Sequence, residues 1–270
     1  MKQSIKSIFN AASIGALGLL TIDQNAHCYV PPSFQFAKAI AKKHQGIDES
    51  RFRSKVFMLK SNGDVSRTLT ETLYFSSPET VTVRITDEQG QEIATASRRL
   101  NASTSAEHQR SFLWDLLFIK DFNTVFEHFK MRGLPMRTES DLYSEKEGNL
   151  PYKPEITTNL ARFDGKITVL LADTSGNGPQ LWLEKDSLLP LKAKIPADAV
   201  EYSMSGFQLY KNFLYPRNIQ INRDGKLWAR LETTEVRFGS GLGSIEPARG
   251  KADIDGQTRE FVEAYLKCVR

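Results

Sequence analysis

Tight-turn signals recur along this chain, and they constrain its fold more than any other feature. Pairs such as Asn62-Gly63 and Asp164-Gly165 readily adopt the positive φ angles that a two-residue hairpin needs. Hairpins join antiparallel strands, whereas parallel strands need long crossover connections. We therefore expect an antiparallel sheet. The turns predicted between apolar segments lie at 61–64, 87–90, 164–165, 176–179, 185–187 and 223–225.

Helical periodicity is confined to a few stretches. Apolar residues recur at helical spacing in 33–44, after two prolines. The dense apolar run at 112–119 and the segment 121–132 predict two short helices joined near Lys120, and 256–269 predicts a terminal helix. The order of helix, strands, helix pair, strands and helix predicts an α+β fold.

The first 28 residues differ from the rest. Lys2 and Lys6 precede twelve uncharged, mostly apolar residues at 11–22, and Ala26 and Cys28 place small residues where a signal peptidase reads them. This run is too short to span a bilayer but suits a signal peptide. We expect residues 1–28 to be a signal peptide and the mature protein to be periplasmic, without a transmembrane segment. A buried N-terminal helix is the alternative.

The two cysteines of the chain are Cys28 and Cys268. Residues 25–27 fit poorly before a lipidated cysteine, so we expect no lipid anchor at Cys28. If Cys28 leaves with the signal peptide, Cys268 is a lone thiol, and if it stays, the two could pair in an oxidising compartment. Two cysteines are too few for a disulfide framework or a cysteine-based zinc site.

No catalytic motif is present. The histidines lack metal-ligand spacing, and His128 is expected on a helix surface. The glycine-rich segment 239–244 lacks the lysine of a phosphate loop. The net charge of +4 comes from basic residues interleaved with acids, which does not indicate nucleic-acid binding. We therefore expect no enzyme activity, cofactor or metal.

Several strands carry bulky apolar residues on both faces. Phe57 alternates with Val56 and Met58, and Trp182 alternates with Leu181 and Leu183. A sheet that is buried on one face only would alternate cleanly between apolar and polar residues. Two interpretations follow: helices or crowded side chains cover both faces, or a curved sheet packs a core on one side and holds an apolar ligand on the other.

The segment Gln180–Leu191, with its acidic turn followed by Leu-Pro-Leu, resembles a strand-turn-strand unit of the periplasmic lipoprotein carriers (the LolA/LolB-like half-barrel superfamily). Residues 207–238 are similar to the next strands, and 61–78 to an early hairpin. The resemblance covers about 50–86 and 160–238. It implies a curved antiparallel β-sheet, a half-barrel, with helices covering its concave side. Residues 29–270 would form one such domain, with a helical insertion at about 105–155.

The same resemblance implies a non-catalytic carrier that holds acyl chains of lipids or lipoproteins in an apolar cavity. The alternative is a protein-interaction or envelope-stress-sensing module, whose partners would be envelope proteins. That alternative predicts a solid interior and an exposed apolar patch near 112–130. A slip of one position would exchange the two faces of any strand. The candidate cavity residues are Phe57, Leu73, Phe75, Val83, Trp114, Leu117, Trp182, Leu183 and Trp228.

Overall fold

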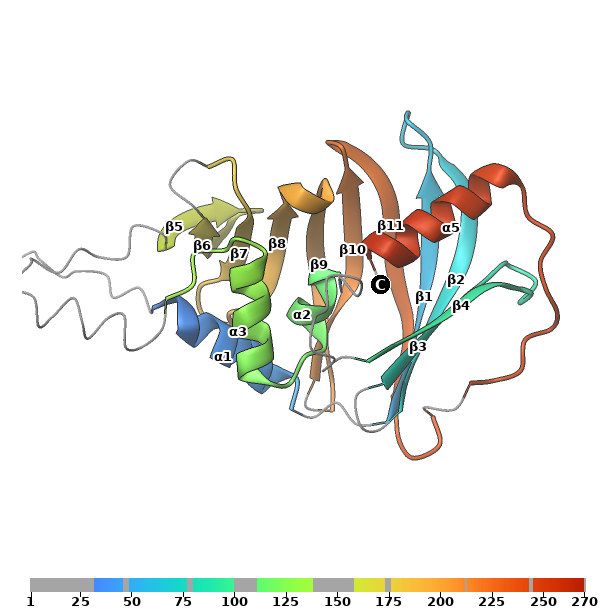
Figure 1. Cartoon of the computed structure of the whole chain (residues 1–270), viewed down its shortest axis with the longest axis horizontal. Coiled ribbons are helices and arrows are strands. Elements are labelled where there is room, and N and C mark those ends of the chain that lie inside the picture. The colour runs from blue at the N-terminus through green and yellow to red at the C-terminus, as the bar shows by residue number, and fades with distance from the viewer. Residues whose placement is uncertain are drawn as a thin grey trace, which may run out of the picture.

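The computed structural model describes residues 32–45, 49–76, 80–99, 111–137, 158–172, 176–211, 213–242 and 245–269. The expected signal peptide at 1–28, which includes Cys28, lies outside these ranges, as do the parts of the expected insertion at 105–110 and 138–155. Within them, an open curved antiparallel sheet carries helices on one side (Figure 1). This confirms the predicted α+β half-barrel with helices on its concave side.

The sheet has eleven strands in the order β4-β3-β2-β1-β11-β10-β9-β8-β7-β6-β5. Every neighbouring pair is consecutive in sequence except β1 and β11, which join the two halves. Each pair is antiparallel, as the turn signals predicted. The strands are β1 (Ser50–Leu59), β2 (Val65–Ser76), β3 (Thr80–Thr86), β4 (Glu92–Arg99), β5 (Thr158–Phe163), β6 (Lys166–Ala172), β7 (Gln180–Glu184), β8 (Pro190–Ile195), β9 (Val200–Tyr210), β10 (Phe213–Arg223) and β11 (Lys226–Phe238).

The helices of the described ranges lie where the periodicity placed them. They are α1 (Ser33–Lys43), α2 (Phe112–Leu117), α3 (Phe122–Met131) and α5 (Gly256–Cys268), with a 3₁₀ turn at Pro196–Asp198. Asp121 and Asp255 accept backbone N–H bonds at the starts of α3 and α5, so the sequence itself determines where these helices begin.

The turn between β9 and β10 has no signature in the sequence. The structure starts β9 at Val200 and places the following turn at Lys211, whose φ is 54°. A lysine gives no turn signal in the sequence, whereas a proline such as Pro216 is usually confined to strand edges and bulges. Pro216 is tolerated in β10 because the ladder to β11 starts only at Asn218.

The core of the concave face is centred on the ring of Phe52 in β1. Phe52 contacts Phe75 and Tyr215 on neighbouring parts of the sheet, at centroid distances of 5.3 and 4.9 Å. Phe118, which follows α2, completes the cluster at 5.6 Å from Phe52. Offset and edge-on ring pairs add about 0.5–1.5 kcal/mol each beyond the area that they bury. The cluster therefore fixes α2 against the central strands.

The convex face carries the second set of bulky side chains, covered by cations. The guanidinium of Arg230 lies 4.6 Å from the ring centroid of Phe57, and the ammonium of Lys192 lies 5.0 Å from that of Trp182. Cation–π contact and the aliphatic stems of these long side chains shield the rings from water. In the part of the chain that the structure describes, cations and not helices cover these rings, so the strands are apolar on both faces.

One acidic residue interrupts the apolar face of β2. Glu71 is 1% exposed and lies on the same face as Leu69 and Leu73. Its carboxylate accepts a hydrogen bond of 2.7 Å from the Tyr265 hydroxyl of α5. A buried carboxylate needs such donors, so this contact orients α5 on the concave face.

The two phenylalanines of β1 test the assignment of faces. Phe52→Ala should lower the free energy of unfolding by about 3–5 kcal/mol because it opens a cavity in the core. Phe57→Ala should cost about 1 kcal/mol, because Phe57 is half-buried and loses mainly its contact with Arg230. Urea unfolding followed by circular dichroism measures both values. Equal losses would contradict the assignment.

Candidate functional site

The helix α2 occupies the middle of the concave face. None of its six residues is more than 1% exposed, and the following Phe118 and Ile119 are equally buried. The Trp114 ring lies 6.4 Å from Phe75 on β2, and Phe118 lies 5.6 Å from Tyr215 on β10. An isolated helix of this length is unstable in water, so packing alone keeps α2 helical.

Polar contacts hold both ends of α2. At its start, the Ser111 hydroxyl accepts the Leu113 N–H at 3.2 Å and lies 3.4 Å from the Tyr202 hydroxyl. Tyr202 also donates to the Cys268 carbonyl at 2.7 Å, and burial raises the pKa of its phenol. Tyr202 therefore connects the start of α2 with the end of α5.

A buried ion-pair geometry connects α2 with α3. The Asp115 carboxylate lies 2.8 Å from His128 Nδ1, with side chains 2% and 9% exposed. The expectation that His128 lies on a helix surface was wrong. The sequence held one signal of this contact, namely Asp115 within the apolar run 112–119. A buried carboxylate needs a partner from another element, which here is His128.

The end of α2 is held by α1. His44 is fully buried, and its Nδ1 lies 2.8 Å from the Ile119 carbonyl oxygen. The imidazole also packs edge-on against Phe213, at a centroid distance of 6.0 Å. Burial lowers the pKa of His44 to about 4, so the ring is neutral near pH 7 and donates its Nδ1 proton to the carbonyl.

The structure separates the nine candidate cavity residues into distinct places. Leu73, Phe75 and Val83 lie together on the concave face of β2 and β3, and Leu183 lies on the same face of β7. β7 is six strands from β2, a distance of about 29 Å along the sheet at ~4.8 Å per strand. Only an extended ligand could contact both places.

The other candidates lie on helices or on the opposite face. Trp114 and Leu117 belong to α2, and Trp228 sits at a β-bulge and packs on Phe261 of α5 at 4.8 Å. Phe57 and Trp182 point to the convex face and cannot line the same space as Leu73 or Leu183. Phe57 and Trp182 were assigned to the wrong face because neighbouring residues of a strand point to opposite sides, and the sequence alone does not decide which side is concave.

The apolar concave surface continues beyond the buried core. Leu160 on β5 pairs with the buried Val169, and Ile167 follows on β6 on the same face. Their side chains are 44% and 46% exposed. The concave face therefore presents apolar surface to solvent at the β5–β6 end of the sheet.

The apolar patch expected near 112–130 under the protein-interaction alternative is absent from this part of the described chain. Residues 112–119 are buried, as are Val125, Phe126 and Phe129 of α3. The expectation was wrong because these side chains pack against the sheet and against α1.

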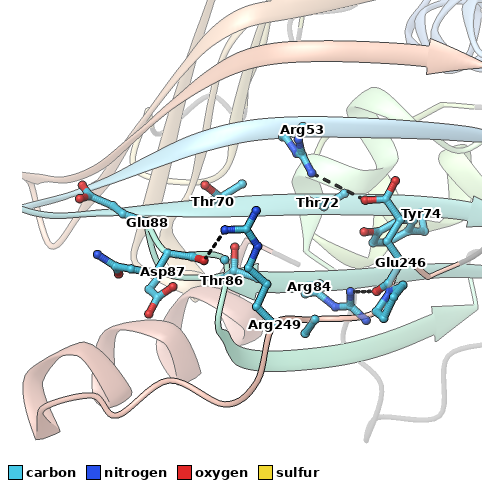
Figure 2. Close-up of a pocket in the computed structure, with 14 residues that line it drawn as sticks. Arg53, Thr70, Thr72, Tyr74, Arg84, Thr86, Asp87, Glu88, Glu246 and Arg249 are labelled. Atoms are coloured by element: carbon cyan, nitrogen blue, oxygen red, sulfur yellow. Dashed lines mark hydrogen bonds and ion pairs between the residues drawn. The ribbon is translucent and has the colours of Figure 1, made fainter.

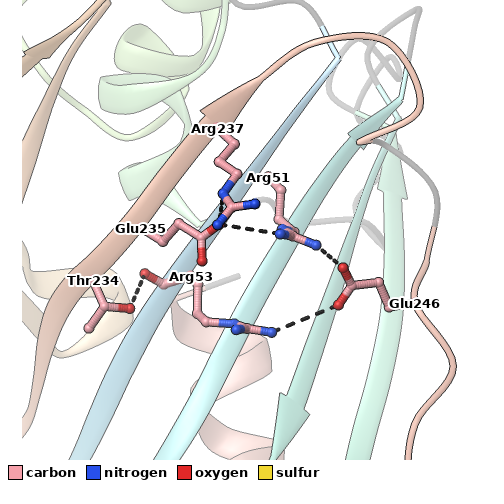
Figure 3. A network of polar contacts seen from close by, with 6 residues as sticks. All are labelled: Arg51, Arg53, Thr234, Glu235, Arg237 and Glu246. Carbon is pink, nitrogen blue, oxygen red and sulfur yellow. Dashed lines mark hydrogen bonds and ion pairs between the residues drawn. The ribbon is translucent and has the colours of Figure 1, made fainter.

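The convex face carries a network of ion pairs between β1, β11 and the segment 245–250, which we call the strap (Figure 3). Arg51 contacts Glu235 at 3.2 Å and also pairs with Glu246 of the strap. Arg53 lies 3.8 Å from the same Glu246 carboxylate. The strap continues to the β4 edge, where the Glu92 N–H donates to the Gly250 carbonyl at 2.7 Å.

Sequence reasoning missed this side of the molecule. Alternate residues of β2, namely Thr70, Thr72 and Tyr74, are polar and face the strap. The alternating threonines of β2 were the sequence signal of this polar face. Alternate residues of a strand share one face, so such a row can line a polar site.

Within the described ranges, no helix is long and apolar enough to cross a membrane. The same residues contain no cluster of three or more His, Cys, Asp or Glu that could hold a metal ion.

No family model matches the chain, and no curated protein matches its sequence. Among solved structures, it is similar to a LolA superfamily protein from Nitrosomonas europaea, with a TM-score of 0.45, 8% identity, and coverage of 78% of this chain and 95% of that one. An outer membrane lipoprotein-sorting protein domain from Vibrio parahaemolyticus has a TM-score of 0.44, 12% identity, and coverage of 87% and 98%. A DUF1329 family protein from Desulfovibrio piger has a TM-score of 0.38, 12% identity, and coverage of 79% and 95%.

The buried His44 makes stability depend on pH. The unfolded chain binds the proton near the ordinary pKa of about 6.5, whereas the folded chain binds it only near pH 4. Stability should therefore fall as the pH drops from 7 to 4.5. The contribution of His44 to this fall should be about 2 kcal/mol.

His44→Gln keeps an N–H donor for the Ile119 carbonyl but does not titrate. Urea unfolding of both proteins at several pH values isolates the contribution of His44, because the carboxylates titrate in both. Parallel stability profiles would show that His44 is not buried as described.

Proposed function

We propose that this protein binds acyl chains of lipids or lipoproteins on the concave face of its sheet and acts as a carrier without catalysis. The observation that carries the proposal is α2, a six-residue helix buried in full against the apolar face of an open sheet. In this proposal α2 fills the ligand site of the empty protein. The acyl chains displace it and take its place.

The size of the ligand follows from the energy of displacement. The seven apolar side chains of 112–119 each gain about 1.5–3 kcal/mol from burial, so exposing them all would cost about 10–20 kcal/mol. The polar contacts at Ser111, Asp115 and Ile119 add about 1–3 kcal/mol each. One 16-carbon chain returns about 13 kcal/mol at ~0.8 kcal/mol per CH₂, and two return about 26. The balance favours ligands with at least two long chains.

The exposed apolar residues Leu160 and Ile167 support a route of entry. They extend the concave surface to solvent beside β6, where an acyl chain can make its first contacts before α2 moves. We further propose that residues 1–28 are a signal peptide, that the protein works in the periplasm, and that residues 29–270 form one domain with its insertion near 105–155.

Quenching of tryptophan by brominated acyl chains tests the proposal. A variant with Trp182→Phe and Trp228→Phe emits from Trp114 alone, which lies where the chains would bind. Phosphatidylcholine with two dibrominated chains should quench this emission strongly, and dibrominated stearic acid, with one chain, should quench it weakly.

The matched control is a variant with Trp114→Phe and Trp228→Phe, which emits from Trp182 on the convex face. Its emission should change little if lipid enters the concave face. Equal quenching of the two variants would indicate adsorption to the lipid surface, and no quenching of Trp114 would refute the proposal.

A further inference from the structure

We propose that the convex face holds a second binding site, a polar groove that takes a neutral polyhydroxylated ligand such as a mono- or disaccharide. The groove lies between the outer face of β1–β3, the turn 87–90 and the strap, and has a volume of about 360 Å³ (Figure 2). Small-molecule sites in proteins have volumes of about 300–1,000 Å³. The sheet separates this groove from the concave face, so the site does not depend on acyl-chain binding.

Several polar groups of the groove have no hydrogen-bond partner among the described residues, and one of them, the Arg53 Nε, is buried. Thr72 and Tyr74 are 4% and 2% exposed, and neither hydroxyl makes a hydrogen bond within the part of the chain that the structure describes. Arg53 Nε is a buried donor that also lacks a hydrogen-bond partner there. Buried polar atoms in proteins are nearly always hydrogen-bonded. The lining is therefore suited to a ligand that supplies many hydrogen bonds.

The strap keeps the groove open instead of filling it. Glu246 fixes one end through Arg51 and Arg53, and its carbonyl accepts a hydrogen bond from Arg84. At the other end, the Gly250 carbonyl accepts a hydrogen bond of 2.7 Å from the Glu92 N–H. Between these anchors, residues 246–249 of the strap line the groove opposite Thr70, Thr72 and Tyr74 of β2.

The charges of the lining decide the class of ligand. Three cations, Arg53, Arg84 and Arg249, face three carboxylates, Asp87, Glu88 and Glu246, so the formal charge of the lining sums to zero. A phosphate would meet as many carboxylates as guanidinium groups. A sugar hydroxyl both donates and accepts, so it can satisfy arginine, carboxylate, threonine and tyrosine groups together. The groove thus favours a neutral polyol over an oxyanion.

Binding of the full-length chain to an array of mono- and disaccharides tests this site. We expect at least one saccharide to bind, and isothermal titration calorimetry then gives its affinity. The double variant Thr72→Val/Tyr74→Phe keeps the shape of the groove and removes two hydroxyls. It should weaken binding of that saccharide about tenfold or more.

Thr95→Val is the matched control, because Thr95 lies on β4, pairs with Arg84 and stands outside the groove. It should leave the affinity unchanged, and thermal unfolding should show that all variants fold. Inorganic phosphate and glucose 6-phosphate should bind no better than glucose. Absence of any bound saccharide, equal affinity of the double variant and the wild type, or preferential binding of phosphate would each overturn the proposal.

Discussion

Aromatic contact between the central strands and α2 organises the concave side of this protein. Phe52 touches rings from β2, β10 and the end of α2, so one side chain fixes the relative positions of elements far apart in sequence. The polar contacts of α2 then follow from its placement. Ser111, Asp115 and the Ile119 carbonyl each contact a different element. These contacts form because the aromatic cluster around Phe52 holds α2 against the concave face of the sheet.

The architecture could be predicted from the sequence because its signals are local. Asn62-Gly63 and Asp164-Gly165 mark hairpins, and the spacing of 112–119 and 121–132 marks two helices. The turn at Lys211 could not be found, because a lysine at positive φ is held by the surrounding ladder and has no sequence signature. Local propensity determined the elements, and tertiary contacts determined their exact limits.

The candidate site was harder to predict because each strand has two faces. Phe57 and Leu73 are equally apolar in the sequence, yet they lie on opposite sides of the sheet. Only the pairing of β1 with β2 and β11 decides between them. The polar partners of α2 and the row of threonines on β2 depend on contacts across the fold, such as His128 with Asp115, and no local pattern reveals these contacts.

The two faces of the sheet carry different chemistry. The concave face buries aliphatic and aromatic side chains under helices, whereas the convex face presents arginines, threonines and carboxylates. The strap joins the two sides, because it lies on the convex face, reaches the β4 edge and is followed in sequence by α5 on the concave face (Figure 1).

The pairing of β1 with β11 has a consequence for the order of folding. Strands β1–β4 can associate as soon as they are synthesised, because each pairs with its neighbour in sequence. The free edge of β1 stays unpaired until β11, the last strand in sequence, has been synthesised. Closing so long a loop is slow, and an open strand edge readily pairs with other chains. The nascent protein is thus most prone to self-association until its final strand is in place.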